Sequence, residues 1–141
     1  MQHMIEFILH NWILFLALIV IIVMLVMNSV RSKMLGFNEL KPVDAVRLIN
    51  RAGPLVLDVR EDSEFGKSYI TGAKHIPVAE LEQRIAELDD WRERDILIYC
   101  RTGQRSAKAA AALKRHGFTS LYKLDGGIMA WQSANLPLSR E

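Results

Sequence analysis

One short stretch, residues 100–106, carries the side chains best suited to chemistry, with the sequence Cys-Arg-Thr-Gly-Gln-Arg-Ser. An apolar run of strand length at 95–99 precedes it, and an Ala-rich run of helical composition at 106–113 follows. Backbone N–H groups in the loop and first helical turn have no intrahelical partners, and the helix dipole is positive there. These groups and two arginines favour the thiolate of Cys100, which is the reactive form. They would also hold an anion, or an anionic sulfur chain built on the cysteine.

The competing interpretation is a structural cysteine. A lone cysteine after a strand is more often a small buried hydrophobe than a nucleophile. An inert core cysteine, however, has no use for Arg101, Arg105, a glycine and a helix N-terminus as neighbours. We therefore interpret Cys100 as a reactive thiol. Ser106 is expected to be the N-cap of the helix that follows, because serine oxygens accept hydrogen bonds from free N–H groups at helix starts.

The composition describes a small chain with room for one domain. The sequence has 141 residues and a formal net charge of +2, without a basic stripe, so nucleic-acid binding is not indicated. Cys100 is its only cysteine, which excludes an internal disulfide and a multi-cysteine metal site. A single free cysteine fits a reducing compartment. We expect neither a metal nor an organic cofactor.

A long apolar segment predicts a transmembrane helix. It is about 20 residues long, enough to cross the bilayer core, and its polar members His10 and Asn11 lie near the outer end. A cleaved signal peptide is less consistent, because no lysine or arginine precedes the run and the residues after it make a poor cleavage site. A buried core helix would need covering layers that so short a chain lacks. We expect a tail at 1–6, the span at 7–27, a linker at 28–37 and a soluble domain at 38–141.

The charges that flank the span predict its orientation. Glu6 is the only charged side chain before it, whereas Arg31, Lys33 and Lys41 follow closely. By the positive-inside tendency, the N-terminus lies outside and the domain lies in the cytoplasm, tethered by a single pass to a bacterial-type inner membrane. Membrane lipid would surround the span, and its polar residues could contact a membrane-protein partner.

Beyond the span, strands alternate with helices, which predicts an α/β fold with a mostly parallel sheet covered on both faces. Expected strands lie at 55–60, 73–76, 95–99 and 121–124; expected helices lie at 42–52, 61–69 (or a turn), 80–88 and 106–113. Asp58 and Arg60 end the first of these strands, where ligands gather in open α/β sheets, and they could equally form a salt bridge with each other. Gly126 and Gly127 permit a close backbone approach, expected beside the cysteine loop. Trp131 is expected in the core.

Four stretches carry a recognisable pattern in a fixed order: Asp58-Val59-Arg60, Gly72-Ala73-Lys74-His75-Ile76-Pro77, Cys100–Ser106 and Gly126-Gly127-Ile128-Met129-Ala130-Trp131. With them, residues 38–137 resemble the single-domain rhodanese family. The resemblance implies a three-layer α/β fold with a central parallel sheet of about five strands. It also implies that Cys100 carries a persulfide. The chain departs from the family at Ser68-Tyr69-Ile70, where Gly-His-Ile is common, in a segment that is usually structural.

The resemblance implies a two-step sulfur transfer with a covalent intermediate. Cys100 would take the outer sulfur of a small anionic donor such as thiosulfate, and a thiol or a protein acceptor would then remove it. The loop residues Arg101, Thr102, Gly103, Gln104 and Arg105 would bind substrate and persulfide, with Asp58, Arg60, Ser106, Gly126 and Gly127 in supporting positions. Arg101 is expected to steer the donor from the rim. Arg105 is expected to hold the loop through a carboxylate such as Asp58.

Two other functions are weighed against this one. Related phosphatases of this fold have one more residue between cysteine and arginine, whereas the six residues from Cys100 to Arg105 make a tighter ring that suits one sulfur atom. Phosphatase or arsenate reductase activity is therefore not favoured. A membrane-tethered interaction module with little or no turnover is the second hypothesis, because a fold does not imply a function. The intact cysteine loop argues against a purely inactive module.

Overall fold

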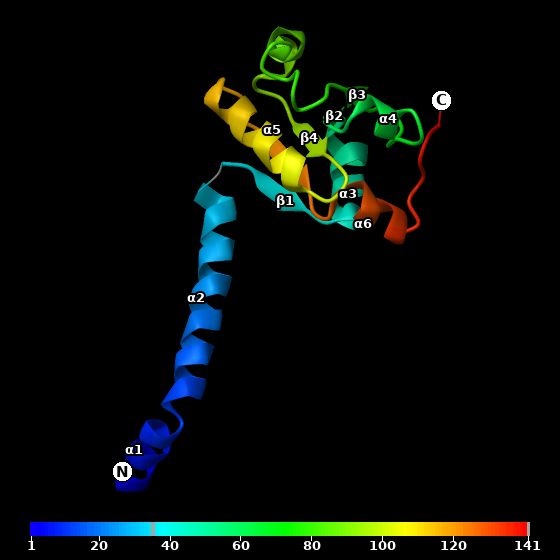
Figure 1. Cartoon of the computed structure of the whole chain (residues 1–141). Helices are drawn as coiled ribbons and strands as arrows, with labels where there is room; N and C mark the ends of the chain where they lie inside the picture. The colour runs from blue at the N-terminus through cyan, green and yellow to red at the C-terminus, as the bar shows by residue number, and fades with distance from the viewer. Residues whose placement is uncertain (35, 141) are drawn as a thin grey trace. The chain divides into compact units, whose positions relative to one another are not determined.

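The chain folds into two separate units. The structure, a computed structural model, describes residues 1–34 and 36–140, with side chains described outside 31–34. The first unit is Met1–Met34 and the second is Leu35–Glu141 (Figure 1). Each unit is described by itself below.

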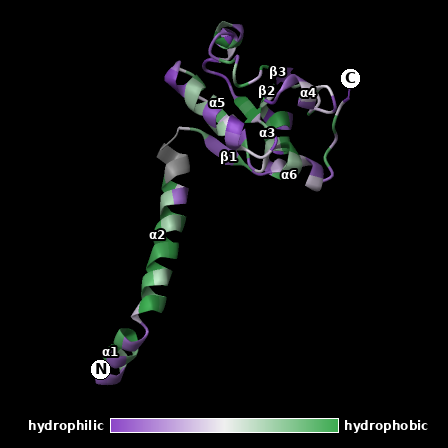
Figure 2. Ribbon diagram, viewed as in Figure 1, coloured by the Kyte–Doolittle hydropathy of each residue, from purple (hydrophilic) through white to green (hydrophobic). Residues whose placement is uncertain are grey.

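The first unit consists of two helices, α1 (Gln2–His10) and α2 (Trp12–Met34). The break between them falls at Asn11, whose side-chain amide donates to the Phe7 carbonyl at 2.9 Å and so competes with the helical hydrogen bonds. Within α2, Trp12–Val30 has a mean hydropathy of 3.0 and is not buried (Figure 2), so the segment has the length and composition of a membrane span or of a signal sequence.

The helix boundaries differ from the expected ones at both ends. The apolar segment is not one helix from residue 7, because of the break at Asn11. At the other end, α2 continues to Met34, so most of the expected linker at 28–37 is helical. The reason is that no glycine or proline interrupts the chain before Gly36, which adopts a φ of 73°.

The second unit is built on a five-stranded, wholly parallel sheet with the order β1-β5-β4-β2-β3. The strands are β1 (Asn38–Leu40), β2 (Leu55–Asp58), β3 (Lys74–His75), β4 (Ile96–Tyr99) and β5 (Leu121–Leu124). The short apolar runs predict buried parallel strands, and all four residues of β4 are buried. The predicted α/β fold with a central parallel sheet of five strands is confirmed.

Helices cover both faces of the sheet (Figure 1). They are α3 (Pro42–Ala52), α4 (Asp62–Phe65), the 3₁₀ helix η1 (Ile85–Trp91), α5 (Gln104–Arg115) and α6 (Gly127–Ser133). Successive residues of β4 alternate between two cores: Ile96 and Ile98 pack with α5 and η1, whereas Leu97 and Tyr99 pack with α3 and α6. Trp131 is buried in the second core, as expected.

The predicted helix at 80–88 is wrong. The chain forms turns there, followed by η1. In this segment Leu81 and Leu88 are fully buried, while the glutamates and Arg84 are at the surface. Ile85 packs against the same core, so these three apolar side chains are buried by the turns and η1 as they would be by an α-helix, and their spacing does not distinguish the two.

Candidate active site

The central strand β4 delivers Cys100 to the carboxyl edge of the sheet. Cys100 follows Tyr99 directly, and α5 begins four residues later at Gln104. The N-cap of α5 is Gly103, with a φ of 115°. The expectation that Ser106 is the N-cap is therefore wrong: the turn at Gly103 starts the helix earlier and places Ser106 inside its first turn, since glycine tolerates this left-handed backbone.

The thiol of Cys100 points into the loop. The residue is 1% exposed. The Gly103 N–H donates to Sγ at 3.0 Å, and the Ser106 hydroxyl lies 3.5 Å from Sγ and 3.0 Å from the Gly103 carbonyl oxygen. A hydroxyl has one proton, so Ser106 can donate either to the carbonyl or to the sulfur at a given moment. The loop can therefore respond to a negative charge on the sulfur.

The loop makes the thiol more acidic than an ordinary cysteine. Burial raises the pKa of Cys100, but hydrogen bonds from the Ser106 hydroxyl and from the backbone N–H groups of Ser106, Gly103 and Thr102 more than offset it. The pKa of Cys100 therefore lies below its usual value. The same donors would stabilise the negative outer sulfur of a persulfide, as in an oxyanion hole.

Ser106→Ala is expected to slow the alkylation of Cys100 by iodoacetamide severalfold at slightly acidic pH. Removing a donor to the thiolate disfavours the charged form, so the pKa of Cys100 rises and the rate–pH curve moves to higher pH. The measurement is the alkylation rate against pH by intact mass. Ser63→Ala, at an exposed position of α4, is the matched control. A curve that does not move would contradict the role given to the Ser106 hydroxyl.

Arg105 pairs with a carboxylate that the sequence did not reveal. Its guanidinium binds Glu64 of α4 with two hydrogen bonds of 2.6 and 2.9 Å. The hydrogen bond from Arg105 lowers the pKa of Glu64 to about 2, so the pair is charged at neutral pH. The prediction that Asp58 is the partner of Arg105 is wrong, because Asp58 pairs with Arg60. Glu64 is also held by a capping box with Glu61, a Glu-x-x-Glu spacing that is too common to identify it in advance.

Asp58 and Arg60 form a salt bridge with each other. Arg60 Nη2 donates to Asp58 at 2.7 Å and to the Ser68 carbonyl at 2.6 Å, and the two side chains are 5% and 0% exposed. Beside them, the buried Tyr99 hydroxyl accepts the Ile70 N–H at 3.0 Å. This cluster joins β2 and β4 to the segment before β3. The cluster therefore supports the cysteine loop by holding these segments together at the carboxyl edge of the sheet.

The two glycines bring α6 against the cysteine loop. The Ile128 N–H donates to the Cys100 carbonyl at 2.9 Å, and the Met129 N–H donates to the Arg101 carbonyl at 3.2 Å. A Cβ on Gly127 would lie 2.5 Å from both carbonyl oxygens. One on Gly126 would lie 2.7 Å from Ala130 Cβ. The close approach to the loop requires glycine at position 127, whereas Gly126 is required by its φ of 72° and by Ala130 of the same helix.

Lys123 of β5 is a further neighbour of the loop that sequence reasoning missed. Its side chain is 12% exposed, and its ammonium lies 2.9 Å from Glu39 and 3.4 Å from the Gly103 carbonyl. Glu39 and Lys123 are direct partners in the sheet register. No local pattern in the sequence indicates this contact, because it depends on the pairing of β1 with β5.

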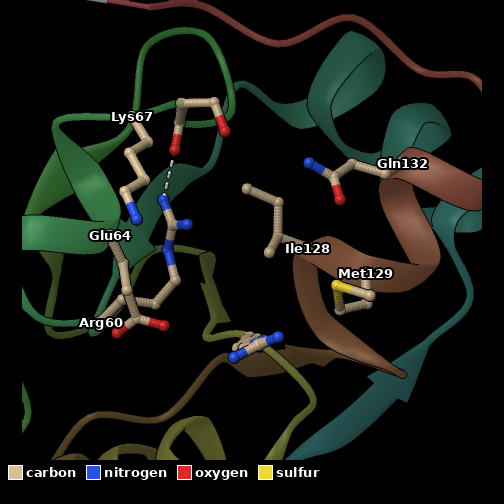
Figure 3. Close-up of a pocket in the computed structure, with 8 residues that line it drawn as sticks. Arg60, Glu64, Lys67, Ile128, Met129 and Gln132 are labelled. Carbon is tan, nitrogen blue, oxygen red and sulfur yellow. Dashed lines mark hydrogen bonds between the residues drawn. The ribbon is translucent and has the colours of Figure 1, made fainter.

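A pocket of about 250 Å³ borders the loop (Figure 3). It is lined by Arg60, Glu64, Lys67, Ser68, Arg101, Ile128, Met129 and Gln132. Arg101 is exposed, and it connects the pocket to the cysteine loop. Thr102 and Gln104 are also exposed, whereas Gly103 and Ser106 are buried. The structure thus brings the predicted loop residues together at one edge of the sheet, with Asp58 and Arg60 beneath them.

The fold and the site define a class of α/β proteins that hold an acidic thiol in a loop of backbone N–H groups at the end of a central parallel strand. A family model described as Rhodanese-like domain matches residues 41–134. The chain therefore belongs to the rhodanese-like family, as the four motifs predict.

Known relatives agree with this assignment. The chain is 27% identical to the protein YibN of Escherichia coli K12 over 99% of both chains. It is 32% identical to the thiosulfate sulfurtransferase GlpE of Pseudomonas putida, over 69% of this chain and 86% of that one. The crystal structure of a rhodanese-related protein from Thermoplasma volcanium matches with a TM-score of 0.67 and 28% identity, over 74% of this chain and 100% of that chain.

Proposed function

We propose that this protein is a membrane-anchored sulfurtransferase that moves a sulfane sulfur from an anionic donor such as thiosulfate to a thiol or protein acceptor. The observation that supports it most is the geometry of the loop, in which the Gly103 N–H donates to the buried Sγ of Cys100 and the Ser106 hydroxyl lies 3.5 Å from it; these contacts lower the pKa of the thiol. Relatives named as sulfurtransferases point to the same chemistry, and one of them is named for thiosulfate.

The proposed reaction has two balanced steps. The Cys100 thiolate attacks the outer sulfur of thiosulfate, the sulfur–sulfur bond of the donor breaks, and sulfite leaves with the electron pair. The persulfide Cys100–S–S⁻ remains, with N–H groups of the loop around its charge. An acceptor such as cyanide then attacks the outer sulfur, thiocyanate leaves, and the Cys100 thiolate is restored. Arg101 attracts the donor from the exposed rim.

The supporting residues keep the loop in place. Arg105 is tied to Glu64 and is therefore assigned to holding the loop. The Asp58–Arg60 pair supports the loop from the sheet side, Gly127 allows α6 to approach the loop, and Gly126 allows the turn that starts α6. With one cysteine in the sequence, the persulfide is not resolved as an internal disulfide, so the sulfur passes to another molecule.

The N-terminal apolar helix is the proposed anchor. The composition and exposure of Trp12–Val30 support a span, and the lysine and arginine that follow it support a cytoplasmic domain at a bacterial-type inner membrane. The proposed organisation is a short tail at 1–6, the anchor, a connection ending near residue 37 and the rhodanese-like domain from residue 38. Lipid, and a membrane-protein partner for the span, complete the proposal.

Intact-mass analysis of the full chain in non-ionic detergent tests the function. After treatment with thiosulfate, the wild-type protein is expected to gain one sulfur atom, which cyanide removes as thiocyanate. Cys100→Ser is the matched control and should gain none. Wild-type protein that is folded but gains no sulfur from thiosulfate or other sulfane donors would contradict the enzyme, and would favour the tethered interaction module.

A further inference from the structure

The proposed span does not need α1 in order to cross a bilayer. The apolar segment Trp12–Val30 has 19 residues, which as a helix rise about 28 Å and so nearly match a hydrocarbon core of about 30 Å. The preceding helix α1 (Gln2–His10) contains the ionisable side chains of His3, Glu6 and His10, which hydrocarbon disfavours. The position of α1 is therefore a separate question from the position of the span.

The side chains of α1 separate into a polar face and an apolar face. At about 3.6 residues per turn, the polar side chains fall on one side of the helix (Gln2, His3, Glu6 and His10) and the apolar ones on the other (Met4, Ile5, Phe7, Ile8 and Leu9). His3 Nδ1 lies 3.9 Å from a carboxylate oxygen of Glu6, as expected for two side chains of one face. Figure 2 shows both kinds of residue in α1. Two separate faces are typical of a helix that lies in the plane of a membrane interface.

The break at Asn11 belongs at the surface of the hydrocarbon. Helix ends leave backbone N–H and C=O groups without intrahelical partners, and hydrocarbon offers them none. The side-chain amide of Asn11 donates to the Phe7 carbonyl, and its backbone carbonyl accepts the N–H groups of the first turn of α2, those of Leu14 and Phe15. The other end groups need water or lipid head groups. Trp12, directly after the break, is of a residue type enriched at the interface.

The apolar face of α1 has no protein cover within the part of the chain that the structure describes. None of the residues of α1 is buried, and the contact that joins α1 to α2 is made by the rings of Phe7 and Phe15, edge to face with centroids 6.5 Å apart. A helix of 9 residues is marginal in water by itself. Lipid is the surface that continues directly from the proposed span. The link to α2 keeps α1 close to that surface, so weak intrinsic binding is sufficient.

We propose that α1 is an interfacial helix: it lies in the plane of the membrane at the N-terminal end of the span, with its apolar face against lipid acyl chains and its polar face toward water. This inference rests on the proposed membrane anchor, and it moves the start of the span from residue 7 to Trp12. The helix opposes displacement of the span along the bilayer normal, because moving the break into hydrocarbon would strip its polar groups of partners.

The test is the depth of single fluorescent labels along α1 in the full chain, reconstituted in phosphatidylcholine vesicles. Each variant carries one introduced cysteine with a nitrobenzoxadiazole label, in a Cys100→Ser background that removes the native thiol. Quenching by lipids with a nitroxide on the acyl chain measures the depth of the label. Ile5→Cys should be quenched about twofold more strongly than Glu6→Cys, and Ile8→Cys about twofold more strongly than His10→Cys.

An upright α1 that continues the span predicts the opposite order. Depth would then increase steadily toward Trp12, so Glu6→Cys and His10→Cys would be the more strongly quenched members of their pairs. That order would overturn the inference, and so would weak, equal quenching of all four labels, which would leave the apolar face to a protein partner. Val20→Cys, inside the span, is the control. A folded protein whose label at this position is not quenched would overturn the proposed anchor and the inference with it.

Discussion

Asp58→Ala is expected to destabilise the domain by about 3 to 5 kcal/mol, because it leaves the Arg60 guanidinium buried without its counter-charge. The two side chains are 0% and 5% exposed, so solvent does not screen the loss. The Ser68 carbonyl would remain as a partner of Arg60, but a neutral oxygen does not replace a carboxylate. The measurement is urea unfolding of the full chain in detergent, followed by tryptophan fluorescence, to which the buried Trp131 contributes.

Asp44→Ala is the matched control, because Asp44 also pairs with an arginine, Arg47 of the same helix, at an exposed site. It should cost no more than about 1 kcal/mol. The double variant Asp58→Leu/Arg60→Met should recover much of the loss, since it removes both buried charges together. Equal effects of Asp58→Ala and Asp44→Ala would show that the buried pair is not a structural support of the site.

Gly127→Ala is expected to cost about 2 to 5 kcal/mol and to lower the reactivity of Cys100. The new methyl group would lie 2.5 Å from the carbonyl oxygens of Cys100 and Arg101, so α6 must move away from the loop. The φ of 60° adds left-handed strain for alanine. Movement of α6 would break the hydrogen bond from the Ile128 N–H to the Cys100 carbonyl, which fixes the loop. Urea unfolding and the alkylation rate of Cys100 measure the two effects.

Gly53→Ala is the control that separates backbone strain from steric overlap in the effect of Gly127→Ala. Gly53 also has a left-handed backbone, with a φ of 55°, but a Cβ there would meet nothing within 4 Å. It should cost only about 1 to 2 kcal/mol and leave the alkylation rate of Cys100 unchanged. If Gly127→Ala behaved like Gly53→Ala in both measurements, the close approach of α6 would not be what holds the loop.

The parts of the fold that depend on short-range pattern could be predicted. The apolar runs at Leu55–Asp58 and Ile96–Tyr99 are buried parallel strands because their composition requires cover on both faces. The cysteine loop was identifiable because its chemistry-bearing residues are contiguous. The close approach at Gly127 was identifiable because only glycine allows the backbone contact that the structure shows there.

Of the features that could not be predicted, two depend on contacts between residues far apart in the sequence and two on local backbone geometry. Arg105 and Glu64 are 41 residues apart, and Asp58 was an equally good partner for Arg105 until the position of α4 was known. Lys123 reaches Gly103 only because β5 lies beside β4. The helix break at Asn11 depends on one side-chain hydrogen bond inside an apolar run. The start of α5 depends on the left-handed backbone of Gly103. Ser106 is also a plausible N-cap residue, so the sequence favoured a later start.

The strand order has a consequence for local unfolding. β1 is the first strand after α2, and it lies at the sheet edge, separated from the cysteine strand β4 by β5. Fraying that begins at the N-terminal edge of the domain would therefore open the pairing of β1 with β5 before it reaches β4. Amide hydrogens of Ile96–Tyr99 should exchange with solvent only on near-global opening, whereas those of Asn38–Leu40 should exchange through smaller fluctuations. Opening of β1 would reach the cysteine loop through Lys123, whose ammonium contacts both Glu39 of β1 and the Gly103 carbonyl.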